Sequence, residues 1–287
     1  MDEIALAVIG GSGVYDMDAL ADVEEIELET PFGPPSDTIV LGTLHGKRVA
    51  FLPRHGRGHR HSPTQVPYRA NIWALKALGV PRIISINACG SMKERYAPRH
   101  VVIPDQIYDH TKQRPLTFFG QGLVAHISLA DPYCEELRVL AGEAVQQAGA
   151  TVHMGGTFVA IEGPRFSTKA ESRIFRQWGV DVIGMTVMPE AALAREAEIC
   201  YASIAHVSDY DVWHETEEPV TVEQVIAILH ANAALSKRAI EVLVQSLPEG
   251  RSCDCQNALA VALITQRDQI PPETVERLRP IVGKYLG

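Results

Sequence analysis

The sequence has no excess of positive charge and no long apolar run. Its 287 residues include 35 Asp and Glu against 26 Lys and Arg, which gives a formal net charge of -9 at pH 7. Nucleic-acid binding needs a basic field and a membrane span needs roughly 18 or more consecutive apolar residues, so we expect neither nucleic acid nor a membrane as a partner. The first residues, Met1-Asp2-Glu3-Ile4, carry no basic segment of the kind that opens a signal peptide. A cytoplasmic location is therefore expected.

Cysteine is scarce, at five residues, and the count is odd. This favours free thiols over a disulfide framework. Cys253-Asp254-Cys255 lacks the two-residue spacer and the second pair of a typical zinc site, so no metal is expected. The alternative is a disulfide that involves Cys253 and Cys255, alone or with Cys134 or Cys200.

Apolar strand-like runs alternate with helical patterns along most of the chain. Strands are predicted at 4–9, 49–52, 83–86, 101–103, 158–161, 182–185 and 200–207. Helices are predicted at 63–79, 134–148, 168–179, 189–196 and 221–247, three of them opened by capping boxes at Ser62, Thr168 and Thr221. Such alternation is typical of an α/β fold. We expect a single domain, residues 1–247, with a central mixed sheet flanked by helices, followed by a linker and a helical appendage over 248–287.

A glycine-rich turn, Gly10-Gly11-Ser12-Gly13, follows the first predicted strand. The backbone N–H groups of such a turn can approach an anion, and Ser12 adds a hydroxyl. The turn does not fit the dinucleotide-binding pattern, because Asp16 stands where the third glycine should be, and it does not end in the Gly-Lys-Ser/Thr of a Walker motif. Taken alone, it favours a plain tight turn.

A basic loop follows the second predicted strand. Six of the eight residues from Arg54 to His61 are Arg or His in an otherwise acidic chain. A guanidinium at a strand end suits a tetrahedral oxyanion, so Arg54 and His55, which lie closest to the strand, are the candidate anion ligands. A metal site made by His55, His59 and His61 is a weaker alternative, because no carboxylate or cysteine lies nearby in the sequence to complete it. A solvated basic loop is the remaining alternative.

Three later strand ends also carry groups that could touch a ligand. Glu162-Gly163-Pro164-Arg165-Phe166-Ser167 lies between a strand and a capped helix, and Phe166 could stack on a flat base. Thr186 could offer its hydroxyl to an anion. Asp209 and Asp211 could both point into one crevice if the chain stays extended there, and burial of one beside the other would raise its pKa and let it donate a proton. The spacing alone indicates an α/β enzyme with an anion site and an acid site.

Together the motifs resemble the trimeric purine nucleoside phosphorylase family, and within it the enzymes that cleave 5′-methylthioadenosine. The resemblance extends from Ile4 to about Leu247. Seven motifs carry it, in the family's order: Ile9-Gly10-Gly11-Ser12-Gly13, Pro53-Arg54-His55-Gly56-Arg57, Tyr68-Arg69-Ala70-Asn71-Ile72-Trp73-Ala74-Leu75, Asn87-Ala88-Cys89-Gly90-Ser91, Ile161-Glu162-Gly163-Pro164-Arg165-Phe166-Ser167, Gly184-Met185-Thr186 with Pro189-Glu190, and Ser208-Asp209-Tyr210-Asp211. The resemblance implies a nucleoside phosphorylase-like fold and phosphorolysis of S-methyl-5′-thioadenosine to adenine and S-methyl-5-thioribose 1-phosphate. Inorganic phosphate would be a co-substrate, and no cofactor is implied.

The resemblance also implies a role for each matching residue. Phosphate would be bound by Ser12, Arg54, His55, the backbone at Ala88, and Thr186. Met185 would lie against the ribose and Phe166 against the purine, while Asp209 would protonate N7 and Asp211 would face the 6-amino group. The methylthio pocket would be lined by Val222, Val225 and Ile226. His126 would reach into the neighbouring subunit's pocket, which implies a homotrimer.

Two positions depart from the methylthioadenosine pattern. Gly184 stands where Asn is expected, and Asn87 stands where Thr is expected. Gly184-Met185 is more like relatives that cleave 6-oxopurine nucleosides or methylthioinosine, which makes such a substrate the main alternative. Asp209 argues against it, because 6-oxopurine enzymes place Asn there and a carboxylate suits a ring with an amino group. A non-catalytic nucleoside sensor is a third hypothesis, against which the set of phosphate ligands counts.

Overall fold

The computed structural model describes residues 3–11, 13–14, 17–214 and 222–287, with the backbone alone described for 222–230. Its strands are β1 (Ile4–Gly10), β2 (Ala21–Ile26), β3 (Ile39–Leu44), β4 (Lys47–Pro53), β5 (Arg82–Ser91), β6 (Val101–Ile103), β7 (Gln106–His110), β8 (Val152–Met154), β9 (Thr157–Ile161), β10 (Val182–Gly184) and β11 (Cys200–Asp209). Its α-helices are α1 (Tyr68–Ala77), α2 (Glu135–Gln147), α3 (Lys169–Gln177), α4 (Val187–Glu196), α5 (Val222–Ser246), α6 (Pro272–Arg277) and α7 (Arg279–Leu286). None of these helices combines the length and apolarity that crossing a membrane requires.

All described strands belong to one mixed sheet, as predicted, with β5 at its centre. β5 pairs in parallel with β1 on one side and β11 on the other, and β4 pairs in parallel with β1. The carboxyl ends of these four strands therefore meet at one edge of the sheet. Beyond that edge the last residues of β5 pair antiparallel with β10, so Gly90 lies opposite both Asp209 and Ile183.

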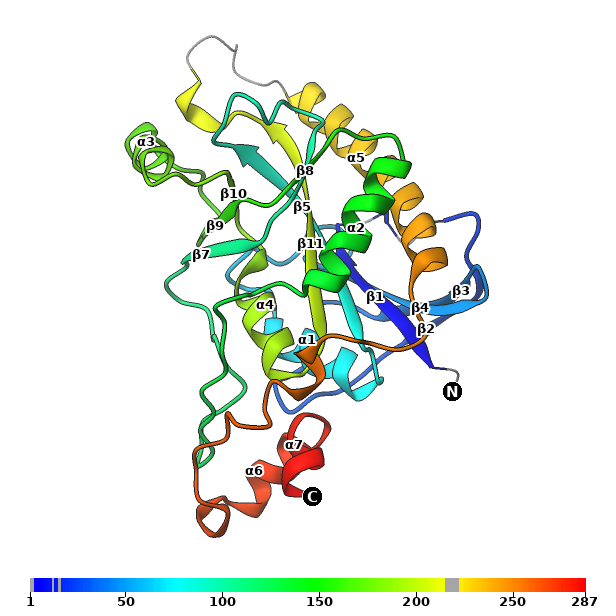
Figure 1. Ribbon diagram of the computed structural model, residues 1–287, viewed down its shortest axis with the longest axis vertical. Coiled ribbons are helices and arrows are strands. Elements are labelled where there is room, and N and C mark those ends of the chain that lie inside the picture. Colours follow the sequence, from blue (N-terminus) through cyan, green and yellow to red (C-terminus); the bar gives the residue numbers. More distant parts are fainter. Residues whose placement is uncertain (1–2, 12, 15–16, 215–221) are drawn as a thin grey trace.

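Helices cover both faces of the sheet (Figure 1). Successive residues of β1 alternate between the two faces. Ala7 and Ile9 pack in the cluster that contains α1 and α4, whereas Leu6 and Val8 pack in the cluster that contains α2 and α5. Because both faces are buried, the strand is apolar throughout, which is the pattern that made it recognisable in the sequence.

Most of the predicted elements are confirmed, but one helix start is wrong. The predicted strands correspond to β1, β4, β5, β6, β9, β10 and β11, and the Thr168 capping box is present at the start of α3. The helix predicted from Pro63 begins only at Tyr68, because Pro67 has no N–H and the residue before a proline is steered away from helical geometry. Ser62 and Gln65 still bond to each other, through Ser62 Oγ and Gln65 Oε1 at 2.8 Å, but they form a turn. Thr221 lies outside the described residues.

The last forty residues leave the sheet and pack beside another projecting segment, residues 116–127 (Figure 1). Ala125 bridges to Leu263, and the backbone N–H of His126 donates to the carbonyl of Ala262 at 2.9 Å. The tail carries α6 and α7. It is held to the main body by Trp73, whose Nε1 donates to the carbonyl of Arg277 at 3.1 Å.

Candidate active site

Arg54 lies directly after β4 and its side chain is buried, with 2% of the residue exposed. The guanidinium pairs with the carboxylate of Glu190 on α4 through Nε and Nη2. Nη2 also donates to Ser85 Oγ at 2.6 Å and to the carbonyl of Ile9 at 3.3 Å, while Nη1 donates to the carbonyl of Ile86 at 3.0 Å. Arg54 is therefore fixed by protein contacts.

The charge of this buried arginine is stabilised by its partner. Burial alone would lower the pKa of Arg54, but the carboxylate of Glu190 outweighs burial and raises it. Glu190 also accepts hydrogen bonds at 2.9 Å from Ser85 and from Tyr201. The carboxylate is thus satisfied by three side chains, as a buried charge must be.

Asn87 extends this network towards Thr186. The Asn87 amide donates to Ser203 Oγ at 2.8 Å and to the carbonyl of Ser85 at 3.0 Å. Its oxygen accepts from the hydroxyl of Thr186 at 2.5 Å. A bound anion would have to take that hydroxyl proton away from Asn87. Ala88, whose backbone is the other predicted ligand on β5, is exposed beside this network.

His55 is held in one tautomer. Its Nδ1 lies 2.9 Å from the carbonyl oxygen of His61, and a carbonyl only accepts, so Nδ1 carries the ring hydrogen when His55 is neutral. Burial and the adjacent charge of Arg54 lower the pKa of His55 to about 4. At neutral pH the ring is therefore uncharged and Nε2 offers a lone pair. Its ring also stacks on that of His59, with centroids 4.3 Å apart.

The acid pair at the end of β11 is brought together, but not by an extended chain. Asp211 has a left-handed φ of 51° and begins a 3-10 turn, and its backbone N–H donates to Asp209 Oδ1 at 2.7 Å. The chain from Asp209 to Asp211 therefore does not stay extended, contrary to the assumption made from the sequence. Ser208 donates to Asp209 Oδ2 at 2.7 Å, and Ser172 on α3 donates to Asp211 Oδ2. Burial raises the pKa of Asp211, and the charge of Asp209 adds to that shift.

Two glycines bring backbone close to the site. A Cβ on Gly90 would lie 3.0 Å from Asp209 Oδ1, and a Cβ on Gly184 would lie 2.5 Å from Cζ of Phe158. The ring of Phe158, fully buried in β9, thus fills the space that an asparagine at position 184 would need. The unexpected glycine at this position has a local packing reason.

Met185 and Phe166, the residues predicted to contact the nucleoside, lie in different surroundings. Met185 is half-buried, and its sulfur occupies the space in which a Cβ on Gly163 would stand, 2.5 Å away. Phe166 is 78% exposed. In this structure the phenyl ring is therefore open to solvent on the loop before α3.

The remaining predicted residues are placed elsewhere or lie outside the description. His126 is exposed on the segment that packs against the tail. Ser12 lies outside the described residues. The description also leaves out the side chains of three residues on α5 that were predicted to line the methylthio pocket: Val222, Val225 and Ile226.

Arg114 organises the site, although no sequence pattern pointed to it. Its buried guanidinium donates to the carbonyls of Met185 at 2.7 Å, Glu162 at 2.7 Å and Ile161 at 3.2 Å. It also donates to the carbonyl of Met188 at 2.5 Å. One arginine therefore ties the loop after β9 to the loop after β10. A single arginine in a loop, far from these loops in sequence, has no pattern that predicts this role.

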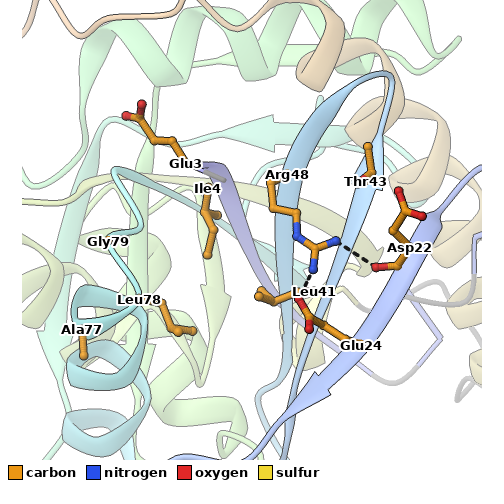
Figure 2. A pocket seen from close by; sticks show the side chains of 10 residues that line it. All are labelled: Glu3, Ile4, Asp22, Glu24, Leu41, Thr43, Arg48, Ala77, Leu78 and Gly79. Carbon is orange, nitrogen blue, oxygen red and sulfur yellow. Dashed lines mark hydrogen bonds and ion pairs between the residues drawn. The ribbon is translucent and has the colours of Figure 1, made fainter. Parts of the chain in front are cut away.

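The cavity shown in Figure 2 lies at the other end of β1 from Gly10. It measures about 560 Å³ and is lined by Glu3, Ile4, Asp22, Glu24, Leu41, Thr43, Arg48, Ala77, Leu78 and Gly79. The guanidinium of Arg48 is already bonded to the carboxylate of Glu24 and to the carbonyl of Asp22. Since none of the strand-end groups lines this cavity, we place the candidate site at the carboxyl ends of β4, β5 and β11.

Comparison with known proteins identifies the family of the chain. Residues 5–245 match the phosphorylase superfamily. The chain is 53% identical over 282 residues to the S-methyl-5′-thioadenosine phosphorylase of Koribacter versatilis, covering 98% of this chain and 97% of the relative. It is 55% identical over 285 residues to that of Geobacter sulfurreducens, covering 99% and 100%.

Solved structures give the same result. A methylthioadenosine phosphorylase from an Antarctic soil metagenomic library superposes with a TM-score of 0.93 at 47% identity, covering 98% of this chain and 99% of the other. The methylthioadenosine phosphorylase of Schistosoma mansoni in complex with adenine superposes with a TM-score of 0.83 at 36% identity, covering 90% and 96%.

Proposed function

The chain belongs to the phosphorylase superfamily and, within it, to the S-methyl-5′-thioadenosine phosphorylases, and from this premise we propose that it cleaves S-methyl-5′-thioadenosine with inorganic phosphate. The products are adenine and S-methyl-5-thioribose 1-phosphate, so the protein is a pentosyltransferase of purine and methionine salvage. In the structure of this chain, the proposal rests on the acid pair Asp209 and Asp211, which lies at the end of β11 beside Gly90.

The reaction breaks the C1′–N9 bond and forms a C1′–O bond to phosphate. The bonding pair leaves with the adenine, and Asp209, which enters the reaction protonated, relieves the charge that develops there by delivering its proton to N7. The proton of HPO₄²⁻ is released as the sugar phosphate forms and restores the acid. The ribosyl group becomes cation-like, and a phosphate anion held next to it stabilises that charge before attacking C1′. Asp211 accepts a hydrogen bond from the 6-amino group.

The phosphate ligands are Ser12, Arg54, His55, the Ala88 backbone and Thr186. The neutral tautomer of His55 favours the role of a hydrogen-bond acceptor towards phosphate, because Nε2 carries a lone pair and no hydrogen. We assign it to the protonated oxygen of HPO₄²⁻, while Arg54 donates to an ionised oxygen. The reaction needs no cofactor, and inorganic phosphate is a co-substrate.

The choice of base follows from the acids. A 6-oxopurine would place the lone pairs of its oxygen against the carboxylate of Asp211, whereas an adenine presents N–H donors there. The packing of Phe158 against Gly184 removes the main argument for a 6-oxopurine, because that glycine has a local steric reason. We therefore prefer S-methyl-5′-thioadenosine over methylthioinosine.

A homotrimer in the cytoplasm completes the proposal. The exposed position of His126 on the projecting segment is consistent with its entering a neighbouring subunit's pocket. In this assignment residues 1–247 are the catalytic domain, the nucleoside also meets Phe166, Met185, Val222, Val225 and Ile226, and residues 248–287 are an appendage.

The test is product analysis with and without phosphate. The protein is incubated with S-methyl-5′-thioadenosine, and in parallel with methylthioinosine, and the free base and sugar phosphate are identified by mass spectrometry. Phosphate-dependent release of adenine, faster than that of hypoxanthine, supports the proposal. Binding without release would point to a sensor, and faster release of hypoxanthine to the 6-oxopurine alternative.

A further inference from the structure

Four of the five cysteines gather in one cluster. The sulfur atoms of Cys134, Cys200, Cys253 and Cys255 all lie within 4.8 Å of one another, and all but Cys253 are buried. They come from three separate parts of the chain: Cys134 caps the amino end of α2, Cys200 is the first residue of β11, and the other two follow α5. The fold thus brings four thiols from distant parts of the chain close together.

The spacing of the sulfurs suits a tetrahedral ion. Zinc binds thiolates at about 2.3 Å, so the sulfurs of a four-thiolate site stand about 3.8 Å apart. The sulfurs of Cys200 and Cys253 are 3.3 Å apart, which is closer to the edge of such a tetrahedron than to a disulfide bond of about 2.05 Å. Four thiolates without oxygen or nitrogen ligands select zinc-type ions over magnesium or calcium.

The surroundings supply positive charge. Nη1 of Arg195 lies 3.6 Å from the sulfur of Cys255, and Nη1 of Arg251 lies 4.0 Å from the sulfur of Cys200. Four thiolates around a divalent ion leave a net charge of about −2, which two guanidinium groups would balance. Cys134 adds a helix amino end, where the backbone dipoles favour a thiolate.

We propose that Cys134, Cys200, Cys253 and Cys255 bind one Zn²⁺ ion as a closed structural site. All four ligand positions are taken by protein, so the ion has no open position for a substrate. The site lies at the amino end of β11, whereas Asp209 lies at its carboxyl end, which separates the metal from the reaction. Its role is to hold the segment after α5, and with it the tail, against α2 and β11.

The proposal replaces the sequence-based expectation of no metal. Cys253-Asp254-Cys255 has the wrong spacing to make a site by itself. The missing pair is supplied by Cys134 and Cys200, which are 66 residues apart in the chain and brought together only by the fold.

Metal analysis of the whole protein tests this directly. The chain is purified under reducing conditions without chelators, and zinc per chain is measured by mass spectrometry for the wild type, Cys253→Ser and Cys89→Ser. Cys89 is the matched control, a buried cysteine outside the cluster. We expect about one zinc per chain in the wild type and in Cys89→Ser, and a loss of at least tenfold in Cys253→Ser.

Cobalt reconstitution of the wild type does not depend on any variant folding. Reduced, metal-stripped protein titrated with Co²⁺ should develop thiolate-to-cobalt charge transfer and the intense visible bands of tetrahedral cobalt, saturating at one ion per chain. Failure of the reduced wild type to take up either metal would overturn the proposal. An intact mass lower by two or four hydrogens in the purified protein, which reports disulfides among these cysteines, would overturn it as well. Both readouts are independent of catalysis.

Discussion

Arg54 and Glu190 form an ion pair in the interior, where their side chains are 3% and 1% exposed. They are 136 residues apart in the sequence and join the end of β4 to α4. The pair fixes a basic group of the candidate site that is almost completely removed from water. Its removal should therefore affect both stability and phosphate binding, and the two effects can be measured separately.

Arg54→Ala leaves the carboxylate of Glu190 buried without its cation. Breaking one partner of such a pair typically costs ~3–5 kcal/mol, so the free energy of unfolding should fall by about that amount. A charged hydrogen bond to phosphate is typically worth ~1.5–3 kcal/mol, so the KM for phosphate should rise roughly ten- to a hundredfold while the KM for the nucleoside changes little. Urea unfolding and steady-state kinetics at a temperature where the variant is folded give the two quantities.

Arg57→Ala is the matched control. Arg57 belongs to the same basic loop but is 39% exposed and pairs with Glu25 on the surface. It should leave the KM for phosphate unchanged. An Arg54→Ala protein with reduced stability and an unchanged KM for phosphate would make Arg54 a purely structural residue.

The Arg54 pair illustrates what the sequence could and could not predict. β1 was recognisable because both of its faces are buried, and the start of α3 because its capping box is local. β2 was missed because five of its six residues are exposed and three are acidic, so it lacks the apolar run that marks an interior strand. The partner of Arg54 could not be predicted, since no local pattern connects residues so far apart.

The sequence predicted that two acids lie at the end of β11, but not how they are held there. The sequence placed Asp209 and Asp211 at one strand end, and the structure confirms that they meet. It could not show that Asp211 turns back in a left-handed conformation, nor that Ser172 of another helix bonds it. Such features depend on how distant elements pack.

Glu196 predicts a pH dependence of stability. It is buried on α4 and accepts hydrogen bonds from the Thr117 hydroxyl and the Phe118 N–H, at 2.6 and 2.7 Å, and burial raises its pKa to about 7. The folded state therefore binds more protons than the unfolded state between about pH 4.5 and 7. The contribution of Glu196 to the free energy of unfolding is therefore fully present below about pH 4.5. It is lost as the pH rises through about 7, and the total loss is about 3 kcal/mol.

Glu196→Gln should remove this slope. The Gln oxygen can accept from Phe118 and its amide can donate to Thr117, so the contacts survive without the titration. The variant should match the wild type near pH 4.5 and be more stable at pH 8, as measured by urea unfolding across the pH range. Equal slopes for the two proteins would show that Glu196 does not titrate in this window.

Gly184→Asn tests the packing reason for the unexpected glycine. The added Cβ would stand 2.5 Å from the ring of Phe158, and overpacking of this kind typically costs ~1–3 kcal/mol. The melting temperature of Gly184→Asn should be lower than that of the wild type. The fall caused by Gly184→Asn should be smaller when it is made in a Phe158→Leu background than when it is made in the wild type. If the asparagine is accepted at no cost beside Phe158, then packing does not explain the glycine.

Asp209→Asn tests the choice of base. The oxygen of the new amide can keep the bond from the Asp211 N–H, and its nitrogen can donate to Ser208 Oγ, so the local geometry is retained while the transferable proton is lost. General-acid help is typically worth ~10²–10⁴-fold, so kcat/KM for S-methyl-5′-thioadenosine should fall by about that factor. Methylthioinosine can use a neutral hydrogen-bond donor on the N7 and O6 edge of its base, which the Asn amide supplies, so its kcat/KM should fall less or rise. The kcat/KM for both substrates is measured on the wild type and on Asp209→Asn. An equal drop for both substrates would mean that Asp209 does not discriminate between the bases. A wild-type preference for methylthioinosine would mean that Gly184 was the better indicator of the substrate.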